Sequence, residues 1–144
     1  MNYPDLDFIL SILLKGDHTV QAANLLRNLA HPLTLSLVHR LQIENALLRS
    51  RYGSDVEAAA IAVAGLGMWR QYLEEQVFVI EPFDLEISFA KAAAWNAASR
   101  KQPVRWSLLI HAAIAASSGA TFLSFDPTLR KVAADEGLDV LPGG

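Results

Sequence analysis

Three carboxylates stand at positions where folding could bring them together. Asp5 follows a very short apolar start of the chain, Glu44 lies in a helix predicted after the second strand, and Asp126 ends the apolar run 121–125. Carboxylates gathered at strand ends repel one another and are costly to desolvate unless a cation lies between them. Mg²⁺ or Mn²⁺ suits such an oxygen site, and one or two ions could activate water for hydrolysis of a phosphodiester.

Each carboxylate also has a purely structural interpretation. Asp126 before Pro127 is a favourable helix N-cap followed by proline at the first helical position. Asp5 could cap a first helix after Pro4 in the same way, and Glu44 could be an ordinary salt-bridged residue of an apolar helix. The joint placement of the three acids at strand ends favours the metal site over three separate structural roles.

The elements that position these acids alternate between strand and helix along the whole chain. Such alternation predicts an α/β fold in one domain, residues 1–144, with a parallel sheet of four to five short strands flanked by helices. In open sheets of this kind the ligand site lies beyond the carboxyl ends of the strands. Beyond the short first strand, we expect strands at 33–38, 77–80, 121–125 and 138–141, and helices at 6–14, 19–29, about 40–51, 55–75, 84–100, 106–118 and 127–136.

Composition excludes several classes of protein. The 144 residues carry 12 Lys plus Arg against 15 Asp plus Glu, a net charge of −3, and 52% are hydrophobic, which argues against disorder and against nucleic-acid binding by bulk charge alone. The chain has no cysteine, so it has neither a disulfide nor a thiolate metal site. No apolar stretch indicates a membrane span, and we expect a cytoplasmic protein.

Basic and aromatic side chains could contact a nucleic acid, although the basic ones could equally be solvated surface charges and the aromatic ones core or interface residues. The candidates for gripping an RNA backbone are Arg40, Arg49, Arg100, Lys101 and Arg105, and the candidates for stacking on bases are Trp69, Tyr72, Trp95 and Trp106.

Four segments together resemble a PIN domain, the fold of the VapC-type ribonuclease toxins. They are Tyr3–Asp7, Leu41–Leu47, His111–Ala115 and Gly119–Asp126. The resemblance implies a three-layer PIN-like fold that holds Mg²⁺ or Mn²⁺ with four acids, which fall on Asp5, Glu44, position 108 and Asp126. It also implies an RNA substrate, an antitoxin partner and a homodimer.

The sequence departs from the family pattern at two of the metal-site positions. Position 108 is a leucine, and Asp7 stands where the family usually has a neutral Ser, Thr or Asn. One account is an altered metal site in which Asp7 compensates, with His111 contributing from one turn further along the helix; Ser107 and Ser124 are further candidate accessory groups. The other is a site without metal chemistry, in which Leu108 packs where the acid stood.

Two hypotheses follow. The first is a metal-dependent endoribonuclease of PIN type, the toxin of a toxin–antitoxin pair, in which Asp5, Glu44 and Asp126 hold the ion and Asp7 assists. The second is a catalytically degenerate PIN-fold protein that acts as a binding or interaction module. The helix predicted over 55–75 is apolar on more than one side, which favours an interface such as a homodimer.

Overall fold

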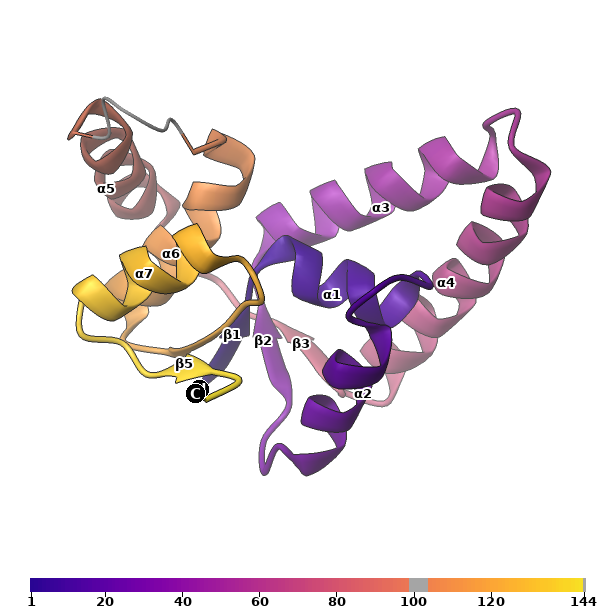
Figure 1. The fold of residues 1–144 in the computed structure, drawn as a ribbon, viewed down its shortest axis with the longest axis horizontal. Coiled ribbons are helices and arrows are strands. Elements are labelled where there is room, and N and C mark those ends of the chain that lie inside the picture. The colour runs from indigo at the N-terminus through magenta and orange to yellow at the C-terminus, as the bar shows by residue number, and fades with distance from the viewer. Residues whose placement is uncertain (99–103, 144) are drawn as a thin grey trace.

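The computed structural model describes residues 1–98 and 104–143. Its five strands form one parallel sheet (Figure 1). The strands lie in the order β3-β2-β1-β4-β5, so the first strand is central and the chain moves outwards on both sides of it. Asn2 of β1 is in register with Leu33 on one side and with Thr121 on the other. The strands are β1 (Asn2–Pro4), β2 (Leu33–Leu35), β3 (Phe78–Ile80), β4 (Thr121–Leu123) and β5 (Val140–Leu141).

Helices cover both faces of this sheet (Figure 1). Helices α1 to α4 lie on one side of the sheet, and α5, α6 and α7 lie on the other. Helices α3 and α4 form a long antiparallel pair that extends away from the sheet. The predicted α/β class, parallel sheet and three layers are confirmed. The helices are α1 (Leu6–Leu13), α2 (Thr19–Asn28), α3 (Leu37–Arg51), α4 (Val56–Glu74), α5 (Leu85–Ala98), α6 (Trp106–Ser118) and α7 (Pro127–Asp135).

The core has two parts because side chains alternate across the strands. In β4, Phe122 packs with the buried residues of α6 and α7, whereas its neighbour Leu123 packs with those of α1 to α4. Both residues are fully buried. Among the described residues, no helix combines the length and the apolar character needed to cross a membrane.

The strand predicted over 33–38 is wrong at its end. β2 stops at Leu35, and α3 begins at Leu37 rather than near Arg40. The cause is a reciprocal cap: the Ser36 side chain accepts from the backbone N–H of His39, and His39 Nδ1 accepts from the backbone N–H of Ser36. This cap converts the last residues of the apolar run into the first turn of a helix.

The helix predicted from residue 55 begins one residue later, at Val56. Asp55 is the N-cap of α4, and its Oδ1 accepts from the backbone N–H of Ala58 at 3.1 Å. β4 likewise ends at Leu123, two residues before the predicted end. The end of α5 predicted near Arg100 lies outside the described residues.

Candidate functional site

Asp5 and Asp126 are joined by one serine at the carboxyl edge of the central strands. Asp5 follows β1 and is buried; its Oδ1 accepts from the backbone N–H of Phe8 at 2.7 Å and its Oδ2 from the Ser124 hydroxyl at 2.5 Å. The same Ser124 oxygen accepts from the backbone N–H of Asp126 at 3.0 Å. Ser124, an accessory candidate in the sequence, is therefore the link between the two acids.

The Asp5 carboxyl carries an electrostatic cost. Its pKa is raised from the usual 3.8 to about 6, mainly by burial and to a smaller extent by the nearby charges of Asp7 and Asp126, while the hydrogen bonds from Ser124 and Phe8 act in the opposite direction. Asp7 lies exposed in the first turn of α1. The structure thus brings Asp5, Asp7 and Asp126 into one acidic group.

The capping interpretation also holds for two of these acids. Asp126 is the N-cap of α7, and its Oδ1 accepts from the backbone N–H groups of Thr128 at 2.8 Å and Leu129 at 3.0 Å. Asp5 is the N-cap of α1. The two roles are compatible, because an N-cap at the end of a parallel strand necessarily stands at the carboxyl edge of the sheet.

Glu44 makes its contacts elsewhere. Its Oε1 accepts from Arg40 Nε at 3.1 Å and from the indole Nε1 of Trp69, a residue of α4, at 3.3 Å. Arg40, a candidate RNA contact, is thereby engaged in a partly exposed ion pair with its own helix, a kind of pair that adds little stability. The carboxylate of Glu44 thus serves the packing of α3 against α4.

The α3 residue that faces α6 is Gln42, which the sequence analysis did not single out. Its Nε2 donates to the backbone oxygen of Ser107 at 2.8 Å, and its Oε1 lies 2.6 Å from His111 Nε2. Gln42 and Glu44 are about 200° apart around the helix, so only one of them can point to α6. The neighbouring Leu108 is half-buried and packs into the core. Neutral residues therefore occupy this junction.

His111 belongs to a buried hydrogen-bond chain. Gln42 Nε2 donates to the Ser107 backbone oxygen, so the amide oxygen Oε1 faces His111 and accepts the proton of His111 Nε2. The other ring nitrogen, His111 Nδ1, accepts from the Tyr3 hydroxyl at 2.9 Å. The hydroxyls of Tyr3 and Ser36 are 3.1 Å apart. The chain connects β1 and the start of α3 to α6.

His39 lies against His111 in the same interior. The two imidazole rings stack with centroids 3.9 Å apart, and His39 Nε2 donates to the backbone oxygen of Pro4 at 2.9 Å. Burial lowers the pKa of His39 to about 3 and holds the pKa of His111 well below its usual value, to which the His39 charge also contributes. Both rings are neutral, hydrogen-bonded connectors. Within the described residues every buried side-chain N or O atom has a partner.

The remaining candidates are scattered. Arg49 is exposed on α3, Arg105 is exposed just before α6, and Arg100 and Lys101 lie outside the described residues. Ser107 contributes its backbone oxygen to Gln42. Of the aromatic candidates, Trp69 is buried, Tyr72 is half-buried, Trp95 Nε1 donates to Glu136 and Trp106 is 43% exposed.

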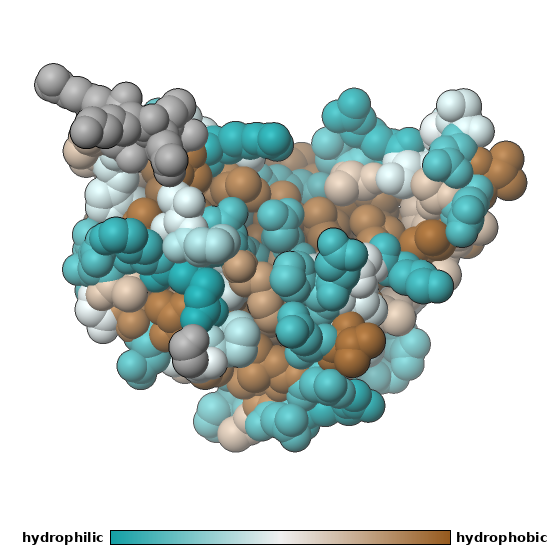
Figure 2. Space-filling view, in the orientation of Figure 1, coloured by the Kyte–Doolittle hydropathy of each residue, from teal (hydrophilic) through white to brown (hydrophobic). Residues whose placement is uncertain are grey.

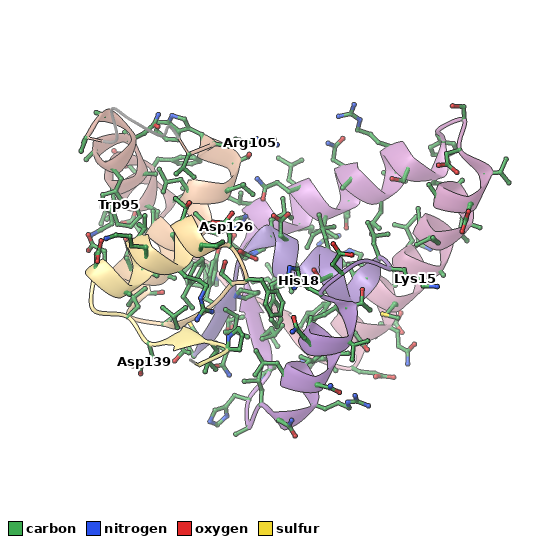
Figure 3. The ribbon with its side chains drawn as sticks, viewed as in Figure 1. Lys15, His18, Trp95, Arg105, Asp126 and Asp139 are labelled. Carbon is green, nitrogen blue, oxygen red and sulfur yellow. The ribbon has the colours of Figure 1, made fainter. Side chains whose placement is uncertain are left out.

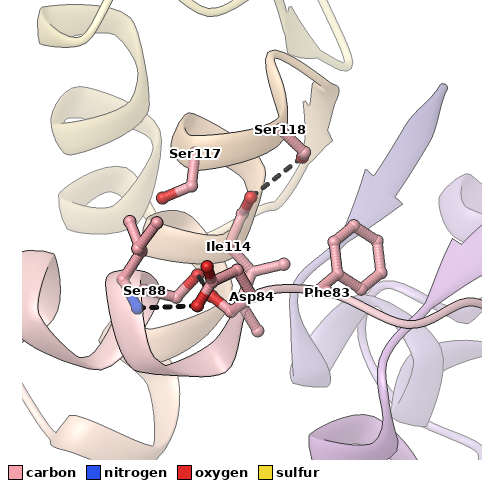
Figure 4. A pocket seen from close by; sticks show the side chains of 7 residues that line it. Phe83, Asp84, Ser88, Ile114, Ser117 and Ser118 are labelled. Atoms are coloured by element: carbon pink, nitrogen blue, oxygen red, sulfur yellow. Dashed lines mark hydrogen bonds between the residues drawn. The ribbon is translucent and has the colours of Figure 1, made fainter.

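A small hollow between α5 and α6 offers little chemistry (Figure 4). Its volume is about 110 Å³. Two polar groups of its wall are engaged locally: Asp84 Oδ1 accepts from the backbone N–H of Ile87, and the Ser118 hydroxyl donates to the backbone oxygen of Ile114. This hollow is a packing gap beside the part of the core that contains Phe122 and the buried residues of α6 and α7.

No family model and no curated protein sequence matches this chain. Two solved structures share its fold at very low sequence identity. FitAcB from Neisseria gonorrhoeae has a TM-score of 0.60 at 12% identity, over 97% of this chain and 96% of that chain. VapBC2 from Rickettsia felis, bound to a DNA fragment from their promoter, has a TM-score of 0.64 at 11% identity, over 97% of each chain. The fold is PIN-like.

The residues of this PIN-like fold do not fit a resident divalent cation. The described residues contain no group of three or more Asp, Glu or His side chains placed to hold an ion. Both oxygens of Asp5 already accept hydrogen bonds, and Gln42 and Leu108 are neutral at the α3–α6 junction. A hard cation needs several oxygen ligands, and Asp5, Asp7 and Asp126 are not placed to supply them together.

Proposed function

We propose that this chain is a PIN-fold protein of the toxin–antitoxin type that acts by binding an antitoxin-like protein partner, with an incomplete metal site. The observation that carries the proposal is the neutral α3–α6 junction, in which Gln42 bonds Ser107 and His111 and Leu108 packs beside them. The likeness in fold to VapBC2, together with the sequence resemblance to VapC-type toxins, supports the type of system.

A second candidate function is metal-dependent cleavage of RNA. It is favoured by the Asp5–Ser124–Asp126 link and by the exposed Asp7 beside it, since these acids stand at the strand ends where ligands bind in such sheets. The cofactor would be Mg²⁺ or Mn²⁺, and the exposed Arg49 and Arg105 would contact the RNA backbone.

Manganese titration distinguishes the two candidates. We expect calorimetry to detect no Mn²⁺ binding by the native chain and saturable Mn²⁺ binding after Gln42→Glu with Leu108→Asp. The physical reason is that two added carboxylates at the α3–α6 junction complete an oxygen site that Asp5 and Asp126 only begin. RNA cleavage is measured on the same preparations.

The control is a double variant, Gln71→Glu with Val20→Asp, which adds two acids on exposed parts of α4 and α2 and should leave Mn²⁺ binding unchanged. Mn²⁺ binding by the native chain that Asp126→Asn abolishes, accompanied by RNA cleavage, would overturn the binding role in favour of the nuclease. Co-expression with the product of a small neighbouring antitoxin-like gene should give a complex that survives gel filtration.

We also propose that the chain forms a homodimer through the outer face of α4. Between Val56 and Met68 the exposed residues of α4 recur at helical spacing and all but Glu57 are apolar, which is unusual for a surface helix. Figure 2 shows apolar side chains on the surface of the α3–α4 pair. The face comprises Val56 at 82% exposure, Val63 at 51%, Met68 at 36%, and the exposed Ala60, Ala64 and Gly67.

A charge in the middle of this face should separate the dimer. We expect Val63→Glu to shift the molar mass measured by light scattering from two chains to one, because a buried unpaired carboxylate is costly. Val20→Glu is the matched control, since Val20 is 71% exposed on α2. A native chain that is monomeric, or a dimer that Val63→Glu leaves intact, rejects this interface.

A further inference from the structure

Three aromatic rings form a nearly parallel stack next to the acidic group. The Phe8 and Phe125 rings are 5.4 Å apart between centroids at an angle of 16°, and the His18 ring lies 4.5 Å from Phe125 at 6°. Phe8 is buried, Phe125 half-buried and His18 exposed. The stack therefore runs from the buried Phe8 to the exposed His18 at the surface.

Backbone neighbours tie this stack to the two linked acids. The backbone N–H of Phe8 donates to Asp5 Oδ1, and Phe125 directly precedes Asp126 in the sequence. In Figure 3 the labelled His18 lies between Asp126 and Lys15. The outermost ring of the stack consequently stands beside the edge of the sheet where a PIN-like fold presents its acids.

The segment that carries His18 is held in place. The Thr19 hydroxyl donates to the backbone oxygen of Leu14 at 3.0 Å and accepts from the backbone N–H of Gly16 at 2.8 Å. His18 Nδ1 lies 3.1 Å from Gln21 Oε1, within hydrogen-bond distance. An incoming ring would therefore meet a surface that is already oriented.

A shallow, open hollow of about 320 Å³ is lined in part by His18. Asp7 lines it from α1, and Lys15 and Asp17 line it from the α1–α2 connection. The hollow thus combines a flat ring, carboxylate acceptors and one ammonium group. Few ligands present a flat ring, adjacent N–H donors and an anionic group together, and a nucleotide is one.

We propose that His18, stacked on Phe125, and Asp7 form a binding site for an unpaired guanine nucleotide. The guanine ring would continue the stack on the exposed His18 ring. Its N1–H and N2–H groups lie side by side, so both can donate to the Asp7 carboxylate, and the phosphate would pair with Lys15. Adenine and uracil present no such pair of donors on one edge. The site requires no metal and goes beyond both functions proposed above.

The test is calorimetric titration of the full chain with guanosine 5′-monophosphate, in the absence of divalent cations. We expect saturable binding that is at least about fivefold weaker in His18→Ala, because one base–aromatic stacking contact is lost. His18→Phe keeps a flat ring and should retain the affinity. His31→Ala, which removes another exposed histidine, is the matched control and should bind like the native chain.

Selectivity is tested with the adenosine, cytidine and uridine monophosphates. We expect each to bind less tightly than the guanosine nucleotide, and Asp7→Asn to remove that difference. Absence of nucleotide binding, equal binding by native chain and His18→Ala, or a native chain without guanine preference would each overturn the proposal. Binding of N-acetyl-arginine amide that depends on His18, without nucleotide binding, would assign the site to a protein partner and also overturn it.

Discussion

Asp5→Asn is expected to stabilise the folded chain at pH 7 by roughly 2–3 kcal/mol. Burial raises the pKa of Asp5 from 3.8 to about 6, so the ionised carboxylate is less stable in the folded chain than in the unfolded one. Asparagine is uncharged and can still accept from the backbone N–H of Phe8 as an N-cap. Its amide can donate to Ser124, which reverses the direction of that bond.

The pH dependence of the gain has a definite sign. Because the folded pKa lies above the unfolded pKa, the contribution of Asp5 to stability is fully present below about pH 4 and is lost as the pH rises to about 6. Native chain and Asp5→Asn should therefore converge in urea unfolding experiments below about pH 4 and separate above pH 6.

A matched control is Asp55→Asn, because Asp55 is an N-cap of the same kind that is exposed. We expect that substitution to change stability little at either pH. If Asp5→Asn destabilises the chain at pH 7, the Ser124 hydrogen bond to the carboxylate outweighs the cost of burial, and the electrostatic account of Asp5 is wrong.

A buried carboxyl that lowers stability is typical of functional sites. The cap on α1 needs only an acceptor, and asparagine would supply one without a charge. The chain nevertheless keeps Asp5 ionisable and links it through Ser124 to Asp126. This pairing is the strongest remaining argument for the second candidate function, and the manganese titration tests it directly.

Local signals were sufficient to predict the fold and the closeness of two candidate acids. Short apolar runs separated by caps gave the alternation of strands and helices, and the carboxyl ends of parallel strands share one edge of a sheet. Asp5 and Asp126 could be placed together because each comes soon after the carboxyl end of a strand and caps a helix: Asp5 directly follows β1, and Asp126 lies three residues beyond the end of β4. Ser124 follows from the same argument, since it lies between β4 and Asp126.

The direction of the α3 side chains could not be predicted, and the reason is His39. The buried line of α3 is His39, Ile43 and Leu47, all with no exposed surface, whereas Leu41 is 72% exposed. A histidine counts as polar in a periodicity pattern, yet here Pro4 and Ser36 satisfy both ring nitrogens in the interior. The helix predicted from about Arg40 left His39 out of the pattern, and Glu44 was chosen for its position after the second strand and by the resemblance to PIN domains.

Long-range stacking was equally hidden. His18 and Phe125 come from opposite ends of the sequence, and only the central position of β1 beside β4 brings their segments together. The aromatic candidates taken from the sequence were the large indole and phenol rings. Of these, Trp69 is buried in the core, and Trp95 donates its indole N–H to Glu136.

Gly65→Ala and Gly67→Ala are expected to change stability in opposite directions, although both glycines lie in the middle of α4. A Cβ on Gly65 would stand 2.7 Å from the backbone oxygen of Leu13 and 3.3 Å from Leu47 Cδ2. Backbone cannot rotate away as a flexible side chain does, so α1 or α4 must shift. Overpacking of this kind costs about 1–3 kcal/mol, more than the gain in helix propensity.

At Gly67 an added Cβ meets no atom within 4 Å. Alanine there should stabilise the chain by about 0.5–1 kcal/mol, because glycine is a poor helix former. Thermal and urea unfolding of the two variants measure the contrast. Gly65 thus allows α1 to approach α4 closely. If the two glycines instead served only to bend α4, the two alanine substitutions would have similar effects. Equal effects of the two substitutions would reject the close contact between α1 and α4.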